Sequence, residues 1–198
     1  MKARELAVAG AYVFTPNIYR DDRGFFVSPF LHSALSETVG HPLFPVRQMS
    51  LSQSQRGVVR GVHYTATPPG NAKLAHCPQG RVLDIMVDLR VGSPTFGQWD
   101  SVVLDREEAL SVYLPVGVGH AFVALADDTV VSYMLSQEYV QANELSVQIL
   151  DPELGLPIPT DIEPLMSPRD TVAETVAEAR DAGRLPDYRD CMKIESAF

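Results

Sequence analysis

Short apolar or alternating segments, divided at close intervals by turn residues, fill the chain from about residue 10 to residue 150. The turn sequences include DDRG, PPGN, PQG, GSPTFG and PVGVG. Glycine, proline, asparagine and aspartate at such points favour reversals of the chain between strands. Many short strands at regular spacing are typical of an all-β sandwich or barrel, so the pattern predicts that class of fold.

The predicted strands share apolar residues and a side-chain period of two. They are Ala11–Phe14, Phe25–Phe30, Arg47–Ser52, Val58–Tyr64, Lys73–Cys77, Val82–Leu89, Trp99–Leu104, Ser111–Leu114, His120–Ala124, Thr129–Leu135 and Leu145–Ile149. The clearest one lies in RVLDIMVDLR, which has Leu83, Ile85, Val87 and Leu89 on one face and Val82, Asp84, Met86 and Asp88 on the other. Because both faces carry apolar residues, we expect both sides of this strand to be partly enclosed.

Two helices are predicted outside the strand-rich region. Ser33–Gly40 ends at a glycine suited to a left-handed cap, and Ser167–Gly183 starts with an N-cap serine followed by proline. Between the barrel and the second helix, the proline-rich segment DPELGLPIPTDIEP predicts an extended strap. We therefore expect one domain over residues 1–198, with the barrel at about 10–150 and the strap and C-terminal helix, folded back on the barrel, at 151–198.

Charge and composition exclude several classes of partner. With 16 basic and 25 acidic residues, the net charge of −9 argues against general nucleic-acid binding. No apolar run approaches a membrane span, and the N-terminal segment has charges where a signal peptide needs apolar residues. We therefore expect a cytoplasmic protein with no membrane partner. Cys77 and Cys191 cannot form a disulfide framework, and neither lies in a CxxC pair.

The mostly apolar stretch VVRGVHYTATPPGNAKLAH, residues 58–76, carries Arg60, His63 and Lys73. Strand alternation puts Gly61 and His63 on one face and Arg60 on the other. His63 is either a structural histidine or a base, and the missing side chain at Gly61 would leave room for a ligand beside the ring. Lys73 is either a solvated edge lysine or, across a hairpin from His63, a cation that stabilises an enolate.

Two further residues each allow a structural and a catalytic interpretation. Tyr133, on the same strand face as Val131 and Leu135, is either a core tyrosine or a proton donor opposite a base. Asp170 lies in SPRD, which matches the Ser-x-x-acid capping pattern. It either caps the helix or, like the third member of a catalytic triad, orients a histidine and stabilises its protonated form.

The spacing Pro115-x-Gly117-x-x-His120 resembles the second sequence motif of the cupin jelly rolls. In metal-binding cupins that histidine is a ligand, and the first motif adds a His-x-His pair. Here His63 has no histidine two residues on. His63 and His120 alone fall short of a three- or four-ligand site, so we predict no metal.

Seven stretches, in order over roughly residues 10 to 170, carry a family resemblance. They are DDRGFF, RGVVRGVHY, KLAHCPQGRVLDIMVDLRVGSPTFGQW, YLPVGVGHAF, SYMLSQEY, DPELGLPIP and LMSPRD. Together they resemble the dTDP-4-dehydrorhamnose 3,5-epimerase family of nucleotide-sugar epimerases. The resemblance implies a cupin-type jelly-roll homodimer that needs no cofactor. It also implies a dTDP-sugar as the substrate.

The resemblance assigns a role to each matching residue. His63 corresponds to the base, with Asp170 as its partner. Tyr133 corresponds to the acid on the opposite face, and Lys73 to the cation at the C4 keto oxygen. The implied substrate-binding residues are Arg23 and Arg60 on the diphosphate with help from His120, Tyr139 on thymine, and Gln48 and Glu144 at further contacts.

The implied chemistry agrees with the residues present. A 4-keto sugar has acidic C–H bonds at C3 and C5, so epimerisation needs a base, an acid and a cation but no nicotinamide or metal. No glycine-rich dinucleotide fingerprint appears in the chain. The likeness is closest to the antibiotic deoxysugar branch, specifically its C5 type. We therefore expect C5 inversion of a dTDP-4-keto-6-deoxyhexose, a 2,6-dideoxy or 3-amino-trideoxy sugar of an antibiotic pathway.

Three alternatives remain open at this point. The chain is a 3- or 3,5-epimerase of the same substrates, a non-catalytic sugar-binding jelly-roll module, or a metal-dependent cupin isomerase or oxygenase. Solvent deuterium uptake into a 4-keto sugar nucleotide separates the enzymes from the binding module. Metal analysis tests the third alternative.

Overall fold

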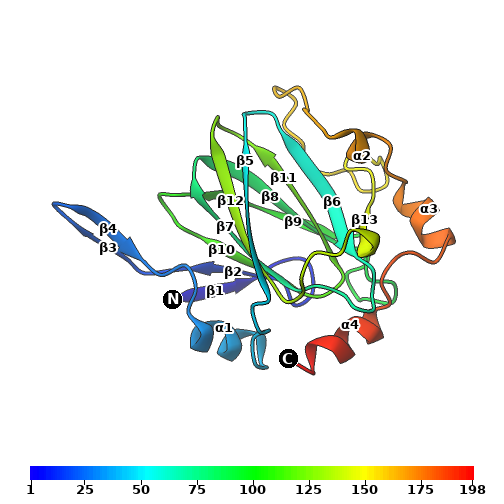
Figure 1. Cartoon of the computed structure of the whole chain (residues 1–198), viewed down its shortest axis with the longest axis horizontal. Coiled ribbons are helices and arrows are strands. Elements are labelled where there is room, and N and C mark those ends of the chain that lie inside the picture. The colour runs from blue at the N-terminus through cyan, green and yellow to red at the C-terminus, as the bar shows by residue number, and fades with distance from the viewer.

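Two antiparallel sheets form the centre of a computed structural model that describes all of residues 1–198 (Figure 1). The first sheet has the strand order β1 (Lys2–Glu5), β2 (Tyr12–Thr15), β10 (Ser111–Leu114), β7 (Lys73–Gln79), β12 (Thr129–Leu135) and β5 (Gln48–Ser54). The second has the order β13 (Glu144–Ser146), β6 (Val59–Thr65), β11 (Val118–Ala124), β8 (Arg81–Asp88) and β9 (Trp99–Asp105). Each strand predicted from the sequence overlaps a strand of the structure, but the one predicted at Phe25–Phe30 ends at Val27 and the one at Leu145–Ile149 ends at Ser146.

The main core lies between the inner faces of these sheets. Val13 and Val112 of the first sheet pack in one buried cluster with Val82 and Met86 of the second. The apolar members of each strand's inner face therefore hold the sheets together. This arrangement of two facing antiparallel sheets, with few and short helices, confirms the predicted all-β jelly-roll fold.

A second core covers the outer face of the second sheet. Ile85 and Val87 of β8 are fully buried there against Leu154 and Ile162 of the strap, and against α3 (Val176–Asp181). The indole nitrogen of Trp99 donates to the Leu154 carbonyl oxygen at 2.9 Å. The burial of both faces of β8 is thus as predicted, whereas turns at residues 152–154 and 160–161 interrupt the predicted extended strap.

Helices close one end of the barrel. Helix α1 (His32–Val39) ends at Gly40, which has the left-handed conformation predicted for it. Helix α4 (Tyr188–Glu195) packs near it, because Leu35 and Cys191 belong to one cluster with Phe14 of β2. Figure 1 shows both helices beneath the sheets.

The predicted helix Ser167–Gly183 is wrong as a single element. It is divided into α2 (Pro168–Thr171) and α3. Thr175 starts α3 with a capping box, in which its side chain accepts from the Glu178 N–H and the Glu178 side chain accepts from the Thr175 N–H. These local bonds compete with continuation of α2. Helix α4, which starts at the N-cap Asp187, was not predicted.

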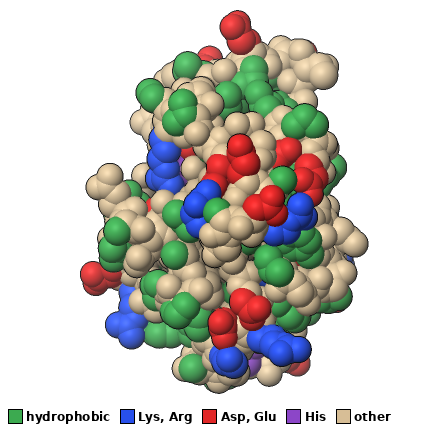
Figure 2. Space-filling model, turned by 90° about the vertical axis from the view of Figure 1, so that its right-hand side faces the viewer, with side chains coloured by type: hydrophobic (Ala, Val, Ile, Leu, Met, Phe, Trp, Pro, Cys, Tyr) green, Lys and Arg blue, Asp and Glu red, His purple; other side chains and the backbone are tan.

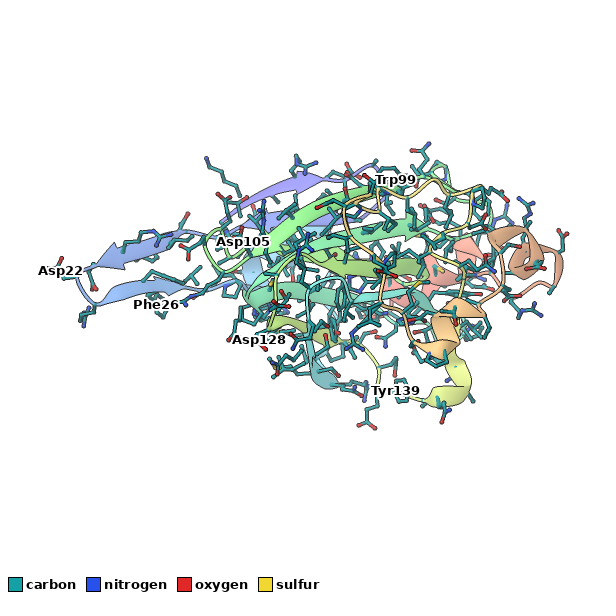
Figure 3. All side chains as sticks on the ribbon, turned by 90° about the horizontal axis from the view of Figure 1, so that it is seen from above. Asp22, Phe26, Trp99, Asp105, Asp128 and Tyr139 are labelled. Atoms are coloured by element: carbon teal, nitrogen blue, oxygen red, sulfur yellow. The ribbon has the colours of Figure 1, made fainter.

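Two further strands were also not predicted. Strand β1 is exposed throughout, and β3 (Ile18–Asp21) pairs with β4 (Gly24–Val27) in a hairpin with no core face of its own. The hairpin projects well beyond the sheets (Figures 1 and 3). No helix of the chain is long and apolar enough to cross a membrane.

The face formed by the C-terminal third of the chain has mixed charge (Figure 2). Asp and Glu side chains gather near its middle, with Lys and Arg beside them. Arg180 lies 3.6 Å from Glu153, and Arg184 pairs with Glu174. Acidic and basic groups therefore offset one another here, and this face is not a continuous basic surface.

Candidate active site

A cavity of about 180 Å³ lies between the two sheets. Its lining comes from β5, β7 and β12 of the first sheet and from β6, β11 and β13 of the second. The lining residues are Gln48, Ser50, Arg60, His63, Asn71, Lys73, His120, Phe122, Tyr133, Leu135, Tyr139 and Glu144. The structure thus brings together eight of the predicted site residues, and Asp170 and Arg23 are not in this lining.

A β-bulge in β6 decides which of its side chains reach the cavity. His63 pairs with His120 of β11, but Arg60 pairs with Phe122, so β6 uses one more residue than β11 over the same length. The extra residue reverses the alternation. Arg60 and His63 consequently both line the cavity, and the prediction that they occupy opposite faces is wrong.

Gly61 lies within this bulge and has a φ of +113°. A Cβ atom there would lie 2.5 Å from the carbonyl oxygen of His120 and 2.8 Å from the Cα of Ala121. Only glycine allows β11 to approach so closely. The glycine therefore serves strand packing, which corrects the prediction that it leaves room for a ligand beside His63.

His63 and Asp170 form a hydrogen-bonded pair. The Nε2 atom of His63 lies 2.7 Å from Oδ1 of Asp170. Burial alone would raise the pKa of Asp170, but hydrogen bonds from His63, Ser167 and the Gly61 N–H hold the pKa below its ordinary value. A carboxylate only accepts hydrogen bonds, so Nε2 carries the proton and Nδ1 remains available to a ligand.

The backbone and the side chain of Asp170 have different partners. Ser167 is the N-cap of α2, and its hydroxyl oxygen accepts from the backbone N–H of Asp170 at 3.2 Å. The carboxylate of Asp170 instead contacts His63 and is almost fully buried. The geometry therefore favours the histidine-partner interpretation of the side chain.

Lys73 begins β7, as predicted, but it does not face His63 across a hairpin. The two residues lie in different sheets and meet across the cavity. The ammonium of Lys73 makes no hydrogen bond or ion pair within the chain, although the residue is buried. Burial lowers the pKa of Lys73, while the charges of Glu144 and Asp84 act in the opposite direction.

Tyr133 of β12 enters the cavity from the same sheet as Lys73. Its hydroxyl donates to Ser52 Oγ at 2.7 Å. Burial raises the pKa of Tyr133, which outweighs the opposing effects of the Ser52 hydrogen bond and the Arg60 charge. A phenol that stays protonated, held in the sheet opposite His63, has the properties of a proton donor.

His120 makes a second histidine–carboxylate pair, with a residue that sequence reasoning missed. Its Nε2 atom lies 2.8 Å from Oδ2 of Asp84, and both side chains are buried. The ring of Tyr133 packs edge-on to His120 at 6.2 Å. The sequence signal for Asp84 is a carboxylate within the apolar run VLDIMV, which by itself indicates only a position on a strand face.

Three further lining residues, Gln48, Tyr139 and Glu144, are not fully buried. Gln48 accepts from the backbone N–H of Tyr139 at 2.7 Å and so holds that loop against β5. Tyr139 is 56% exposed, and Figure 3 shows it at the edge of the molecule. The Thr65 hydroxyl donates to Glu144 at 2.9 Å. These contacts position a ring and a carboxylate beside the opening.

Arg23 lies far from this group. It is on the projecting hairpin, its side chain is 90% exposed, and its partner is Asp21. Figure 3 labels Asp22 and Phe26 on the same hairpin, well outside the body that contains the cavity. Within one chain, therefore, the structure does not bring Arg23 to the other predicted site residues.

Comparison with known proteins supplies the decisive observation. The model of the family described as dTDP-4-dehydrorhamnose 3,5-epimerase matches residues 5–178. The chain belongs to this family.

Relatives and solved structures agree with the family match. The chain is 46% identical to a dTDP-4-dehydrorhamnose 3,5-epimerase of Mycolicibacterium smegmatis, over 96% of this chain and 94% of the relative. NovW, a 4-keto-6-deoxy sugar epimerase from the novobiocin cluster of Streptomyces spheroides, superposes with a TM-score of 0.93 at 46% identity, covering 96% and 95% of the two chains. ChmJ, a 3′-monoepimerase from Streptomyces bikiniensis in complex with dTDP-quinovose, gives 0.93 at 44% identity, with 98% of each covered.

Membership of the dTDP-4-dehydrorhamnose 3,5-epimerase family confirms the resemblance found in the sequence, and the chain is an isomerase. This overturns the alternative of a non-catalytic sugar-binding module. A metal-dependent cupin would need several metal-ligating side chains close together. No three His, Cys, Asp or Glu side chains gather as a metal site would require. His63 and His120 each pair with a separate carboxylate instead.

Proposed function

We propose that the protein epimerises a dTDP-4-keto-6-deoxyhexose without a cofactor, through an enolate formed next to the C4 carbonyl. One observation carries the proposal: a histidine with a carboxylate partner and a protonated phenol enter one cavity from facing sheets, with a buried ammonium beside them. Proton transfer at carbon with inversion needs a base on one face and an acid on the other.

Each step follows from these groups. Nδ1 of His63 takes the proton from the carbon, and the electron pair of the broken C–H bond moves to the C4 oxygen. The ammonium of Lys73 stabilises the enolate oxygen. The hydroxyl of Tyr133 then gives a proton to the opposite face, and exchange with solvent restores both groups. Nothing is oxidised or reduced, so no redox cofactor is needed.

The size of the cavity indicates how the rest of the substrate binds. Ligand pockets usually measure about 300–1,000 Å³, and this one has about 180 Å³. The sugar ring can enter, and the dTDP group must lie along the mouth. We assign the diphosphate to Arg60 and His120, the thymine ring to stacking on Tyr139, and further contacts to Gln48 and Glu144.

The hairpin supports a homodimer as the working form. Tyr19 and Phe26 on the hairpin are 63% and 67% exposed, and Leu51 on the edge strand β5 is 65% exposed. Exposed apolar side chains and an unpaired strand edge favour burial against a second copy. In such a dimer, Arg23 of one copy would be free to reach the cavity mouth of the other and to hold the diphosphate there. The whole chain then acts as one epimerase domain.

Two candidates remain for the carbon that is inverted. C5 inversion, with slow or absent C3 exchange, is the prediction from the sequence. Inversion at C3, alone or with C5, is favoured by the names of the relatives, because these are 3,5- and 3-epimerases. For the sugar, the novobiocin-cluster relative supports an antibiotic deoxysugar pathway, with a 2,6-dideoxy or 3-amino-trideoxy hexose as the substrate.

Deuterium incorporation tests the reaction and its position together. The protein is incubated with dTDP-4-keto-6-deoxyglucose in deuterium oxide, and the sugar is followed by NMR. We expect deuterium at a carbon next to C4, chiefly C5, and almost none with His63→Asn, which keeps the phosphate-binding arginines. Label only at C3 refutes C5 inversion and favours a 3-epimerase, and rapid inversion at both carbons indicates a 3,5-epimerase. Absence of exchange from the wild-type protein contradicts the proposed reaction.

A further inference from the structure

Asp84 is a fully buried carboxylate in the middle of β8. It lies directly opposite Phe122 of β11, and His120 is two residues away from Phe122 on the same face of that strand. This register brings Asp84 Oδ2 to 2.8 Å from Nε2 of His120. The other oxygen, Oδ1, is buried and has no hydrogen-bond partner within the protein.

A structural role accounts poorly for this residue. Asp88, on the same strand and equally buried, has both oxygens engaged by Arg90, Ser93 and Thr95. Asp88 is therefore explained by an ion pair that holds loops together. Asp84 has one histidine and an unpartnered oxygen, and apolar residues at both positions 84 and 120 would avoid that unpartnered oxygen if stability alone mattered.

The surroundings of Asp84 are the groups of the candidate site. His120 of β11 is bonded to it, and its charge acts on Lys73 of β7 and on Tyr133 of β12 as well as on the buried thiol of Cys77. Burial lowers the pKa of Lys73, and Asp84 and Glu144 oppose that shift. Burial raises the pKa of Tyr133, and Asp84 adds to that shift. In both cases its charge favours the protonated group.

The bond to His120 also fixes a tautomer. Because a carboxylate only accepts, the proton of His120 lies on Nε2, and Nδ1 makes no hydrogen bond within the chain. The ring lines the cavity. Nδ1 is thus the nitrogen that a ligand meets.

We propose that Asp84 is a positioning residue of the active site: its carboxylate holds His120 by Nε2 at the cavity wall and places negative charge behind Lys73 and Tyr133. This inference rests on the proposed epimerase function. Asp84 touches no substrate itself. It acts through the three side chains that do.

The test is Asp84→Asn, which keeps the shape of the side chain and removes its charge. We expect kcat for deuterium exchange to fall by about 10- to 100-fold, by analogy with carboxylates that orient metal-bound histidines, with a smaller change in KM. The alkaline limb of the pH profile of kcat should move to lower pH, because Lys73 loses one of the two negative charges that raise its pKa. If both kcat and its pH profile are unchanged in Asp84→Asn, the proposal is overturned.

Asp88→Asn is the matched control, since it removes an equally buried charge from the same strand but away from the cavity. It should lower thermal stability and leave the pH profile in place. If both variants shift the profile equally, Asp84 has no specific role.

A measurement on the wild-type protein keeps the proposal testable if Asp84→Asn does not fold. Two-bond ¹H–¹⁵N spectra of the histidine rings should show neutral His120 protonated at Nε2 alone. A mixture of tautomers overturns the proposal. The readouts also separate the two inferences. If the wild-type protein shows no exchange, the proposed reaction is contradicted. If the wild-type protein shows exchange and Asp84→Asn has the same kcat and pH profile, only the role of Asp84 is contradicted.

Discussion

At the scale of single residues, the pairing of His63 with Asp170 determines what the histidine can do. The carboxylate is 4% exposed, and its pKa is held below the ordinary value by the hydrogen bonds that it accepts. An aspartate with a lowered folded-state pKa contributes stability at neutral pH, and this contribution is lost as the pH falls through that pKa. Over the neutral range, therefore, His63 keeps an ionised partner.

Asp170→Asn separates the catalytic interpretation from the capping one. Ser167 caps α2 through the backbone N–H of residue 170, so the substitution leaves the cap intact. We expect turnover to fall by about 10²- to 10⁴-fold, because the imidazolium loses its counter-charge and its fixed tautomer, with the fold retained by circular dichroism. As a control, Thr175→Ala removes the cap of α3, and should cost about 1 kcal/mol with turnover unchanged. Wild-type turnover in Asp170→Asn would reverse the assignment.

Sequence reasoning found most of the residues in the cavity but could not place their side chains. The spacing in SPRD is satisfied by Ser167 and the backbone of residue 170, which leaves the carboxylate free for another partner. Spacing does not distinguish these two uses of one residue. Asp84 was missed for a related reason: the run VLDIMV shows a carboxylate among apolar residues of β8, but its partner His120 lies on β11 and is not visible in that run.

At the scale of elements, the bulge in β6 sets the geometry of the site. Alternation along a single strand predicts that Arg60 and His63 lie on opposite faces. The bulge in the pairing with β11 puts both residues on the same face. The single helix expected at Ser167–Gly183 is also interrupted: α2 ends at Thr171, and the Thr175–Glu178 capping box starts a new helix. Most strand positions were predictable because core burial imposes them, whereas the unpredicted strands β1 and β3 have no core face.

Gly61→Ala tests the bulge. The added Cβ would meet backbone atoms of β11 at 2.5 to 2.8 Å, and these atoms cannot move without shifting the strand. We expect the free energy of unfolding to fall by about 2–5 kcal/mol, and turnover to be lost as Arg60 and His63 are displaced. Gly155→Ala is the control, since Gly155 also has a positive φ but nothing within 4 Å. Its cost should stay near 1 kcal/mol, with turnover kept. Equal effects from the two variants would show that close strand contact is not the reason for Gly61.

At the scale of the whole molecule, the projecting hairpin separates one predicted binding residue from the rest. A chain acting alone leaves Arg23 in solvent and exposes Tyr19 and Phe26. The homodimer that we propose covers the apolar residues and gives the arginine a ligand to bind.

Mixed dimers test whether Arg23 acts on the second copy. Arg23→Ala and His63→Asn chains are each expected to be poorly active and dimeric by light scattering. When the two are mixed and exchanged, each mixed dimer gains one cavity with its own His63 and the partner's arginine. Statistical mixing in a two-fold dimer then restores about a quarter of wild-type activity. No recovery, with mixed dimers verified by tagged capture, contradicts action across the interface, and a monomeric wild-type protein contradicts the dimer itself.

The division of the proposed catalytic groups between two sheets has an evolutionary consequence. His63 belongs to one sheet and Tyr133 and Lys73 to the other, so the separation of base and acid is set by the side chains packed between the sheets, such as Val13, Val82, Met86 and Val112. A change of size in this layer slides one sheet over the other and moves the acid relative to the base. Descendants can therefore diverge in stereochemical outcome through substitutions in the barrel interior, while every group that handles a proton stays the same.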